Sequence, residues 1–259
     1  MTVDALAPLM ELPGVATASD QARDALGRAH RHRTNLRGWP ATAAEAALRG
    51  ARASSVLDGG PVRLEKQAAA VTHPVFAGAL RVALALEGGS GSLVGVWQRA
   101  PLQALARLHV LAAADQVDQD RLGRPRADGE VSPRLELLAN VVTARTRASA
   151  PVVAAVAHGE LLTLKPFGSA DGVVARAVSR LVTMATGLDP HGLGVPEASW
   201  MRQPSVYRDA ARGFADGTPD GVAAWLVLCC RALQAGAREA LTIAESIAES
   251  SSGLPDSDV

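Results

Sequence analysis

The sequence predicts an all-α protein, and three observations support that fold class. Aromatic residues make up only 3% of the 259 residues while alanine is abundant; this favours closely packed helices over a β-sandwich, whose strands need β-branched and aromatic side chains. Apolar residues recur at helical spacing along most of the chain. Prolines and glycines stand where these periodic segments begin and end.

Charge and composition limit the kind of protein. The 26 basic and 26 acidic residues give a net charge of zero, so the overall charge indicates neither a nucleic-acid partner nor an anionic membrane. No run of about 18 uncharged apolar residues occurs, and the N-terminus has no basic-then-apolar signal pattern, so we expect a cytoplasmic protein. The two cysteines, Cys229 and Cys230, are adjacent in an apolar helical pattern, which favours reduced core thiols over a disulfide or a metal site.

The helices expected in the first half of the chain are bounded by turn, proline or capping signals, and they cover about residues 19–33, 42–57, 73–87 and 101–114. A basic cluster, Arg28 to Arg33, closes the first helix; cations are favourable at a helix C-terminus, and contact with a phosphate is the alternative. Thr42 and Glu45 form a capping box after a break at Trp39-Pro40. Residues 88–92 are expected to form a flexible glycine-serine loop.

The second half is expected to contain a charged connection over residues 115–132, helices over about residues 132–147, 151–164, 172–187 and 218–247, and a short helix around Tyr207. The stretch from the 172–187 helix to Gln203 is expected to be irregular, and the last helix to continue past Gly236. The expected domains are an N-terminal helical region over residues 1–60, a main helical domain over 61–249 and a polar, disordered tail over 250–259.

The strongest functional signal lies in the stretch that ends at Arg176. An apolar helix ends near Lys165, a loop of small residues follows, and a second apolar run opens at Gly172. Free backbone N–H groups and the helix dipole make a helix start an anion site, and small residues let a phosphate come close. Ser169 or Asp171 is expected to cap the second helix, with Arg176 facing the same end one turn later.

This stretch resembles the signature of the Fic (filamentation-induced-by-cAMP) family, His-Pro-Phe-x-Asp/Glu-Gly-Asn-Gly-Arg-x-x-Arg, whose members typically transfer AMP from ATP to a protein hydroxyl. Aligned without gaps, four positions match, namely Pro166, Phe167, Gly172 and Arg176. Lys165 stands at the catalytic histidine. The metal-binding acid, the first glycine, the asparagine and the first arginine are replaced by Ser169, Ala170, Asp171 and Val173. The resemblance implies a Fic-like helical bundle with an N-terminal helical extension and most of its chemistry replaced.

Two further segments resemble parts of Fic proteins. Residues 54–59 are similar to the Ser/Thr-x-x-x-Glu-Gly/Asn inhibitory motif, whose glutamate pairs with the last arginine of the signature and blocks productive placement of ATP. The resemblance implies regulatory roles for Ser54 and Asp58, with Asp58 paired to Arg176, and a purely structural ion pair is the alternative. Residues 121–126 resemble the flap that guides a target segment alongside the site, and a solvated loop is the alternative.

The replaced residues argue against AMP transfer. The Fic reaction needs a base, a carboxylate-held metal and donors for the phosphates, whereas Lys165 beside Asp171 is expected to stay charged and Ser169 is a poor sole metal ligand. We therefore expect a non-AMPylating pseudoenzyme that binds a protein partner, or a phosphate or acidic ligand, through Ser169, Asp171, Gly172 and Arg176. The alternative is an active transferase with altered chemistry, in which Lys165 is catalytic as a cationic clamp or nucleophile.

The expected cofactors and partners depend on which of these functions is correct. Binding alone needs no cofactor, and ATP with Mg²⁺ would be needed only by a chain that retains transfer activity. The expected partner is a protein or a small anionic ligand rather than a nucleic acid or a membrane, and assembly as a homodimer is a further alternative.

Overall fold

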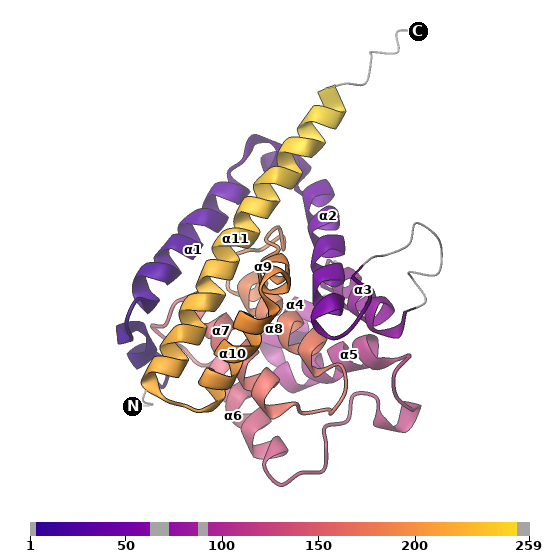
Figure 1. Ribbon diagram of the computed structural model, residues 1–259, viewed down its shortest axis with the longest axis vertical. Helices are drawn as coiled ribbons and strands as arrows, with labels where there is room; N and C mark the ends of the chain where they lie inside the picture. The colour runs from indigo at the N-terminus through magenta and orange to yellow at the C-terminus, as the bar shows by residue number, and fades with distance from the viewer. Residues whose placement is uncertain (1–3, 63–72, 88–92, 253–259) are drawn as a thin grey trace.

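The structure is a computed structural model that describes residues 4–62, 73–87 and 93–252, and in these ranges it contains eleven α-helices, two short 3-10 helices and no strand. The predicted all-α fold class is confirmed. Helix α8 (Asp171–Ala185) is buried over most of its length and packs against α7 (Ala150–Leu164). Figure 1 shows α8 near the middle of the molecule, with the long α11 (Pro219–Ser252) crossing one side.

The N-terminal region forms the 3-10 helix η1 (Ala7–Glu11) and the helices α1 (Val15–His30) and α2 (Arg33–Leu57). Helix α1 starts four residues earlier than the predicted Ser19, directly after Gly14, which is in the left-handed conformation with φ 75°. It lies along α11, and its buried face is mostly alanine, which lets the two helices approach closely.

The predicted chain break at Trp39-Pro40 is wrong. Helix α2 bends at Gly38, whose φ and ψ of −105° and 17° are not helical, and Pro40 lies inside the helix after this kink. A kink accommodates a proline because it removes the clash with the preceding turn and the need for the missing N–H group. Thr42 is therefore not a helix cap; its hydroxyl donates instead to Asn35 Oδ1 at 2.7 Å.

The middle of the chain forms four α-helices and one short 3-10 helix. In chain order these are α3 (Pro74–Leu86), α4 (Leu93–Arg99), α5 (Pro101–Ala113), the 3-10 helix η3 (Gln119–Arg121) and α6 (Val131–Thr143). Helices α3 and α5 begin at their prolines as predicted. Helix α4 was not expected; it buries Leu93 and Trp97. The expected loop over residues 88–92 lies outside the described residues.

The C-terminal region forms α9 (Pro196–Arg202), α10 (Pro204–Ala215) and α11. Helix α9 corrects the expectation of an irregular stretch up to Gln203. Helix α11 passes Gly236 as predicted and continues to Ser252, so the expected tail does not begin at Ser250, and residues 253–259 lie outside the described residues. Cys229 and Cys230 are buried in α11 and form no disulfide.

The predicted N-terminal region is not detached from the remaining helices. Helix α2 packs against α3, α8, α9 and α11, and α1 packs against α11. The division at residue 60 stays a prediction. None of the described helices has the length and hydropathy needed to cross a membrane.

Candidate functional site

The candidate site is built on the loop that joins α7 to α8. Helix α7 ends at Leu164, Lys165 takes the left-handed conformation with φ 47°, and Ala170 takes it again with φ 51° directly before α8. Within the described residues these are the only non-glycine positions with positive φ. The conformation costs a residue with a β-carbon about 1–2 kcal/mol, so surrounding contacts must hold this loop in shape.

Arg126 provides part of that support. Its backbone N–H donates to the Pro166 carbonyl at 2.8 Å, and its guanidinium donates to the carbonyls of Leu164 and Lys165 at 3.0 and 2.9 Å. Carbonyls at the end of a helix lack intrahelical partners, so Arg126 acts as a C-terminal cap for α7. Arg126 is therefore tied to the α7–α8 loop, and a role of residues 121–126 in guiding a partner stays a prediction.

The side chain of Ser169 is hydrogen-bonded to His109 of α5. The backbone N–H of Gly123 donates to His109 Nδ1 at 2.9 Å, which leaves the proton of the neutral ring on Nε2, and that nitrogen lies 3.0 Å from Ser169 Oγ. Burial, and then the charge of Arg121, lower the pKa of His109 to about 4. The same ring stacks on Phe167 with centroids 4.1 Å apart. Sequence reasoning missed this role because His109 lies on a different helix, 60 residues before Ser169.

Asp171 closes the loop rather than capping α8. The cap residue of α8 is Ala170, which has no side-chain cap, so the expectation that Ser169 or Asp171 caps the helix is wrong. Asp171 Oδ1 instead accepts the backbone N–H of Phe167 at 2.9 Å. Burial raises the pKa of this carboxyl to about 6, even though the N–H groups of Phe167 and Gly168 lower it.

The predicted pair of Asp58 and Arg176 is formed. Asp58, at the end of α2, places Oδ1 2.6 Å from Arg176 Nη2 and accepts the backbone N–H of Val173 on Oδ2 at 2.9 Å. No bridging water is needed because α2 comes close to α8 over Gly172, where a β-carbon would collide with the Asp58 carboxylate. The start of α8, predicted to receive an external anion, is therefore occupied by a carboxylate of the same chain.

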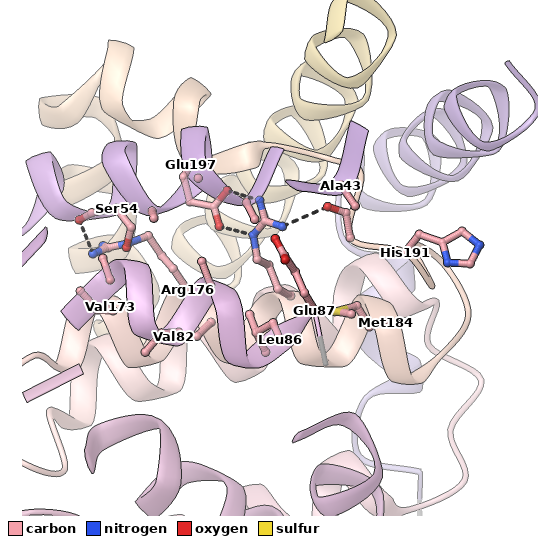
Figure 2. A pocket seen from close by; sticks show the side chains of 18 residues that line it. Ala43, Ser54, Val82, Leu86, Glu87, Val173, Arg176, Met184, His191 and Glu197 are labelled. Carbon is pink, nitrogen blue, oxygen red and sulfur yellow. Dashed lines mark hydrogen bonds and ion pairs between the residues drawn. The ribbon is translucent and has the colours of Figure 1, made fainter. Parts of the chain in front are cut away.

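Arg176 has all its donor nitrogens engaged inside the protein. It is only 2% exposed, and it donates to the hydroxyl and carbonyl of Ser54 at 2.8 and 3.0 Å and to the Tyr207 hydroxyl at 3.4 Å. Figure 2 shows its side chain reaching toward Ser54. Burial alone would lower the pKa of the guanidinium, but Asp58 and Tyr207 raise it overall, so the side chain stays charged.

Tyr207 links Arg176 to the buried His158. Its hydroxyl lies 2.8 Å from His158 Nε2 and accepts from Arg176 Nη1, so it bridges the two side chains. Burial, and then Arg176, lower the pKa of His158 well below its usual value. The imidazole is fully buried among aromatic rings. His158 is therefore a neutral core residue with no access to a ligand.

An open cleft of ≈ 330 Å³ lies between α2, the α7–α8 loop and α10. Its charged lining residues are Asp58, Lys165, Asp171, Arg176 and Arg208. Lys165 and Arg208 are exposed, and neither has an ion-pair partner in the part of the chain that the structure describes. Gly172 also lines the cleft, whereas Ser54 and Ser169 do not. Sequence reasoning missed Arg208 because it stands in no recognisable motif.

Arg176 also lines a second, smaller cavity of ≈ 40 Å³ under α2, α3 and α8 (Figure 2). The other guanidinium there belongs to Arg180, which pairs with Glu197 at 2.7 Å and donates to the Gly194 carbonyl at 2.8 Å. Both cations of this cavity are thus satisfied by the protein, and the cavity is about the size of one water molecule. The larger cleft is therefore the candidate functional site.

The described residues contain no group of three or more His, Cys, Asp or Glu arranged to hold a metal ion. No family model matches the chain, and no curated protein matches it. A solved structure does: a Fic family protein from Desulfovibrio desulfuricans G20 is similar to this chain with a TM-score of 0.68 and 20% sequence identity, over 89% of this chain and 74% of that one. At this identity the likeness shows that the two chains share a fold.

Proposed function

We propose that this chain is a Fic-like protein that does not transfer AMP, and that it binds an acidic group at the cleft through Lys165 and Arg208. The observation that supports this most is the position of Asp58. Its carboxylate accepts a hydrogen bond from the Val173 N–H at the start of α8 and another from the Arg176 guanidinium, so neither is free for a ligand. An incoming anion is left with Lys165 and Arg208, the two lining cations that have no ion-pair partner within the described ranges. An acidic side chain of a protein partner and a phosphate of a small ligand both supply the required charge.

The residues do not fit a magnesium-bound nucleotide. The carboxylates of Asp58 and Asp171 both line the cleft, where they would repel the phosphates. The N–H group of Val173 is already bound. Ser169, which stands at the position of the metal-binding acid, is tied to His109 and does not line the cleft. The mechanism we propose is therefore binding without a chemical step.

An altered transferase is the second candidate, and one observation favours it: Lys165 and Arg176 line the same cleft. In that mechanism Lys165 would hold or attack an acidic or phosphorylated substrate, and Asp58 would have to leave Arg176 before the arginine could reach a ligand. The Asp58 pair would then be regulatory. In the binding protein that we favour, Ser54 and Asp58 fix the position of Arg176 and of the start of α8.

The test is calorimetric titration of the intact chain with inorganic phosphate, and with ATP in the presence and absence of magnesium. We expect phosphate binding to weaken about tenfold in Lys165→Ala and in Arg208→Ala, since each loses one charge-assisted contact. The control Arg231→Ala removes an exposed arginine of α11 outside the cleft and should leave the affinity unchanged. Magnesium should not strengthen the binding of ATP.

Two results would contradict this proposal. Micromolar binding of ATP that depends on magnesium would mean that the phosphate cradle is intact. Transfer of a labelled group from a nucleotide to protein, lost in Lys165→Ala, would establish the altered transferase instead.

A further inference from the structure

The cleft is lined by charges of both signs. Among the described residues, none of Lys165, Arg208 and Asp171 has an ion-pair partner. Asp58 is neutralised by Arg176, so its charge is already balanced. The unpaired charges are therefore two cations and one carboxyl on the wall of a single cleft.

Resting on the proposed function, we infer that the ligand of this cleft carries a basic group as well as its acidic group, with the acid at Lys165 and Arg208 and the amine or guanidinium at Asp171. The ligand class is thus a small zwitterion, such as an amino-phosphate or an amino acid. The inference follows from the cost of desolvation. A bound ligand removes water from the charges of the cleft, and a charge left without a partner then loses more free energy than an ion pair elsewhere in the cleft gains.

A purely anionic ligand meets only part of this requirement. It would pair with Lys165 and Arg208 while desolvating the Asp171 carboxyl and bringing a second negative charge toward it. Asp171 still has acceptor capacity, since its Oδ1 takes the Phe167 N–H and a carboxylate has about four lone-pair sites. Two charges act on this carboxyl: Arg126 lowers its pKa and Asp58 raises it. Arg126 donates to the Leu164 and Lys165 carbonyls, and Arg176, which lines the same cleft, is paired with Asp58.

Three matched probes test the inference on the intact chain: O-phosphoethanolamine, inorganic phosphate and ethanolamine, titrated by calorimetry at pH 7.5. We expect O-phosphoethanolamine to bind at least about tenfold more tightly than phosphate, which is the gain of one charge-assisted hydrogen bond. Asp171→Asn should reduce this preference to about threefold or less, because the amide keeps the shape and one acceptor oxygen but has no negative charge for the ammonium. The same variant should bind phosphate at least as well as the unmodified chain.

A second measurement separates ligand contact from a general effect of the substitution. The Asp171 carboxyl is followed by carbon NMR as a function of pH in the unmodified chain; its pKa is raised to about 6 by burial in the free protein. O-phosphoethanolamine should lower this pKa, because a nearby ammonium favours the ionised carboxyl, whereas phosphate should raise it or leave it unchanged.

The outcomes distinguish this inference from the proposed function. Equal affinity for O-phosphoethanolamine and phosphate, with both weakened by Lys165→Ala, would overturn the zwitterion and leave anion binding standing. Binding of ethanolamine alone, or binding of none of the three probes, would overturn both. An Asp171 pKa that does not fall with O-phosphoethanolamine would overturn the placement of the amine at Asp171.

Discussion

Asp58 does for this chain what a bound anion would do for an open helix start. Its carboxylate accepts the Val173 N–H, pairs with Arg176 and lies directly over Gly172. Arg176 is almost fully buried, and a buried cation without its partner is costly, so this pair fixes how α2 sits on α8. At the scale of single residues, the Asp58 carboxylate therefore decides which groups of the site a ligand can reach: Arg176 and the Val173 N–H are already bound to it.

Removing the Asp58 carboxylate should therefore be strongly destabilising. We expect Asp58→Ala to lower the free energy of unfolding by about 3 kcal/mol or more, because Arg176 is left buried without its counter-charge. Urea denaturation at pH 7.5 measures the change. The control is Asp209→Ala, which breaks the exposed Arg212–Asp209 pair and should cost less than about 0.5 kcal/mol. A small loss in Asp58→Ala together with new affinity for ATP would instead favour the regulatory interpretation of this pair.

Asp171 should make stability depend on pH in a predictable direction. Its pKa is about 6 in the folded chain and about 3.9 in an unfolded one. The folded state thus favours the protonated form, so the contribution of this group is fully present below pH 4 and is lost as the pH rises through 6. Since the carboxyl is partly solvated, we expect the unmodified chain to lose about 1–2 kcal/mol relative to Asp171→Asn between pH 4 and pH 7. Parallel urea curves at the two pH values test this, and equal losses in both proteins would contradict it.

At the scale of whole elements, the long helix α11 shows how packing overrides local preference. Gly236 lies in its middle, where glycine is unfavourable by about 1 kcal/mol relative to alanine. The backbone of Val195 passes so close that the Val195 N–H donates to the Gly236 carbonyl at 3.3 Å, and a β-carbon on Gly236 would lie 2.7 Å from Val195 N and from Pro196 N. The glycine is therefore needed for the approach of another segment and does not mark a helix end.

Two glycine-to-alanine substitutions should change the stability of the fold in opposite directions. Gly236→Ala should lower the melting temperature, because overpacking against backbone costs about 1–3 kcal/mol, more than the gain in helix propensity returns. Gly27→Ala in α1 should raise stability by about 0.5–1 kcal/mol, since its β-carbon would meet only the flexible end of Arg31 at 3.0 Å. Thermal unfolding followed by circular dichroism compares them, and stabilisation by both would show that the segment around Val195 can move away from α11.

At the scale of the whole molecule, the reactivity of the two cysteine thiols should measure how often the fold opens. Cys229 and Cys230 are buried in α11, each in a hydrophobic cluster formed with other helices. Burial raises the pKa of the Cys230 thiol to about 12 and that of Cys229 well above its usual value. Reaction requires the thiolate and access to it, so local motions at the surface should leave both groups protected.

We expect both thiols to react with a disulfide reagent at pH 8 only as fast as the folded chain unfolds, and both to react at once in concentrated urea. The time course of absorbance with and without urea measures this. Where the rate follows the population of the open form, Asp58→Ala should accelerate the reaction about tenfold for each 1.4 kcal/mol of stability that it loses. Rapid reaction of one thiol in the native protein would show that the C-terminal helix opens separately from the rest.

Much of the helical framework could be predicted because its signals are local. The spacing of apolar residues and the prolines at Pro74, Pro101 and Pro219 identify helices from short windows of sequence. The kink at Gly38 and the unexpected α4 and α9 show where local signals fail, since tertiary packing decides whether a proline breaks a helix or only bends it.

The sequence by itself determined the fold class, the position of the loop between two apolar helices and, through its resemblance to Fic proteins, the pairing of Asp58 with Arg176. Only the tertiary structure decided that Asp58 also binds the start of α8, that His109 holds Ser169 away from the cleft, and that Arg208 joins Lys165 beside it. The physical reason is that helix boundaries depend on neighbouring residues, whereas the partner of a charge at a helix end comes from whichever element the chain brings across it.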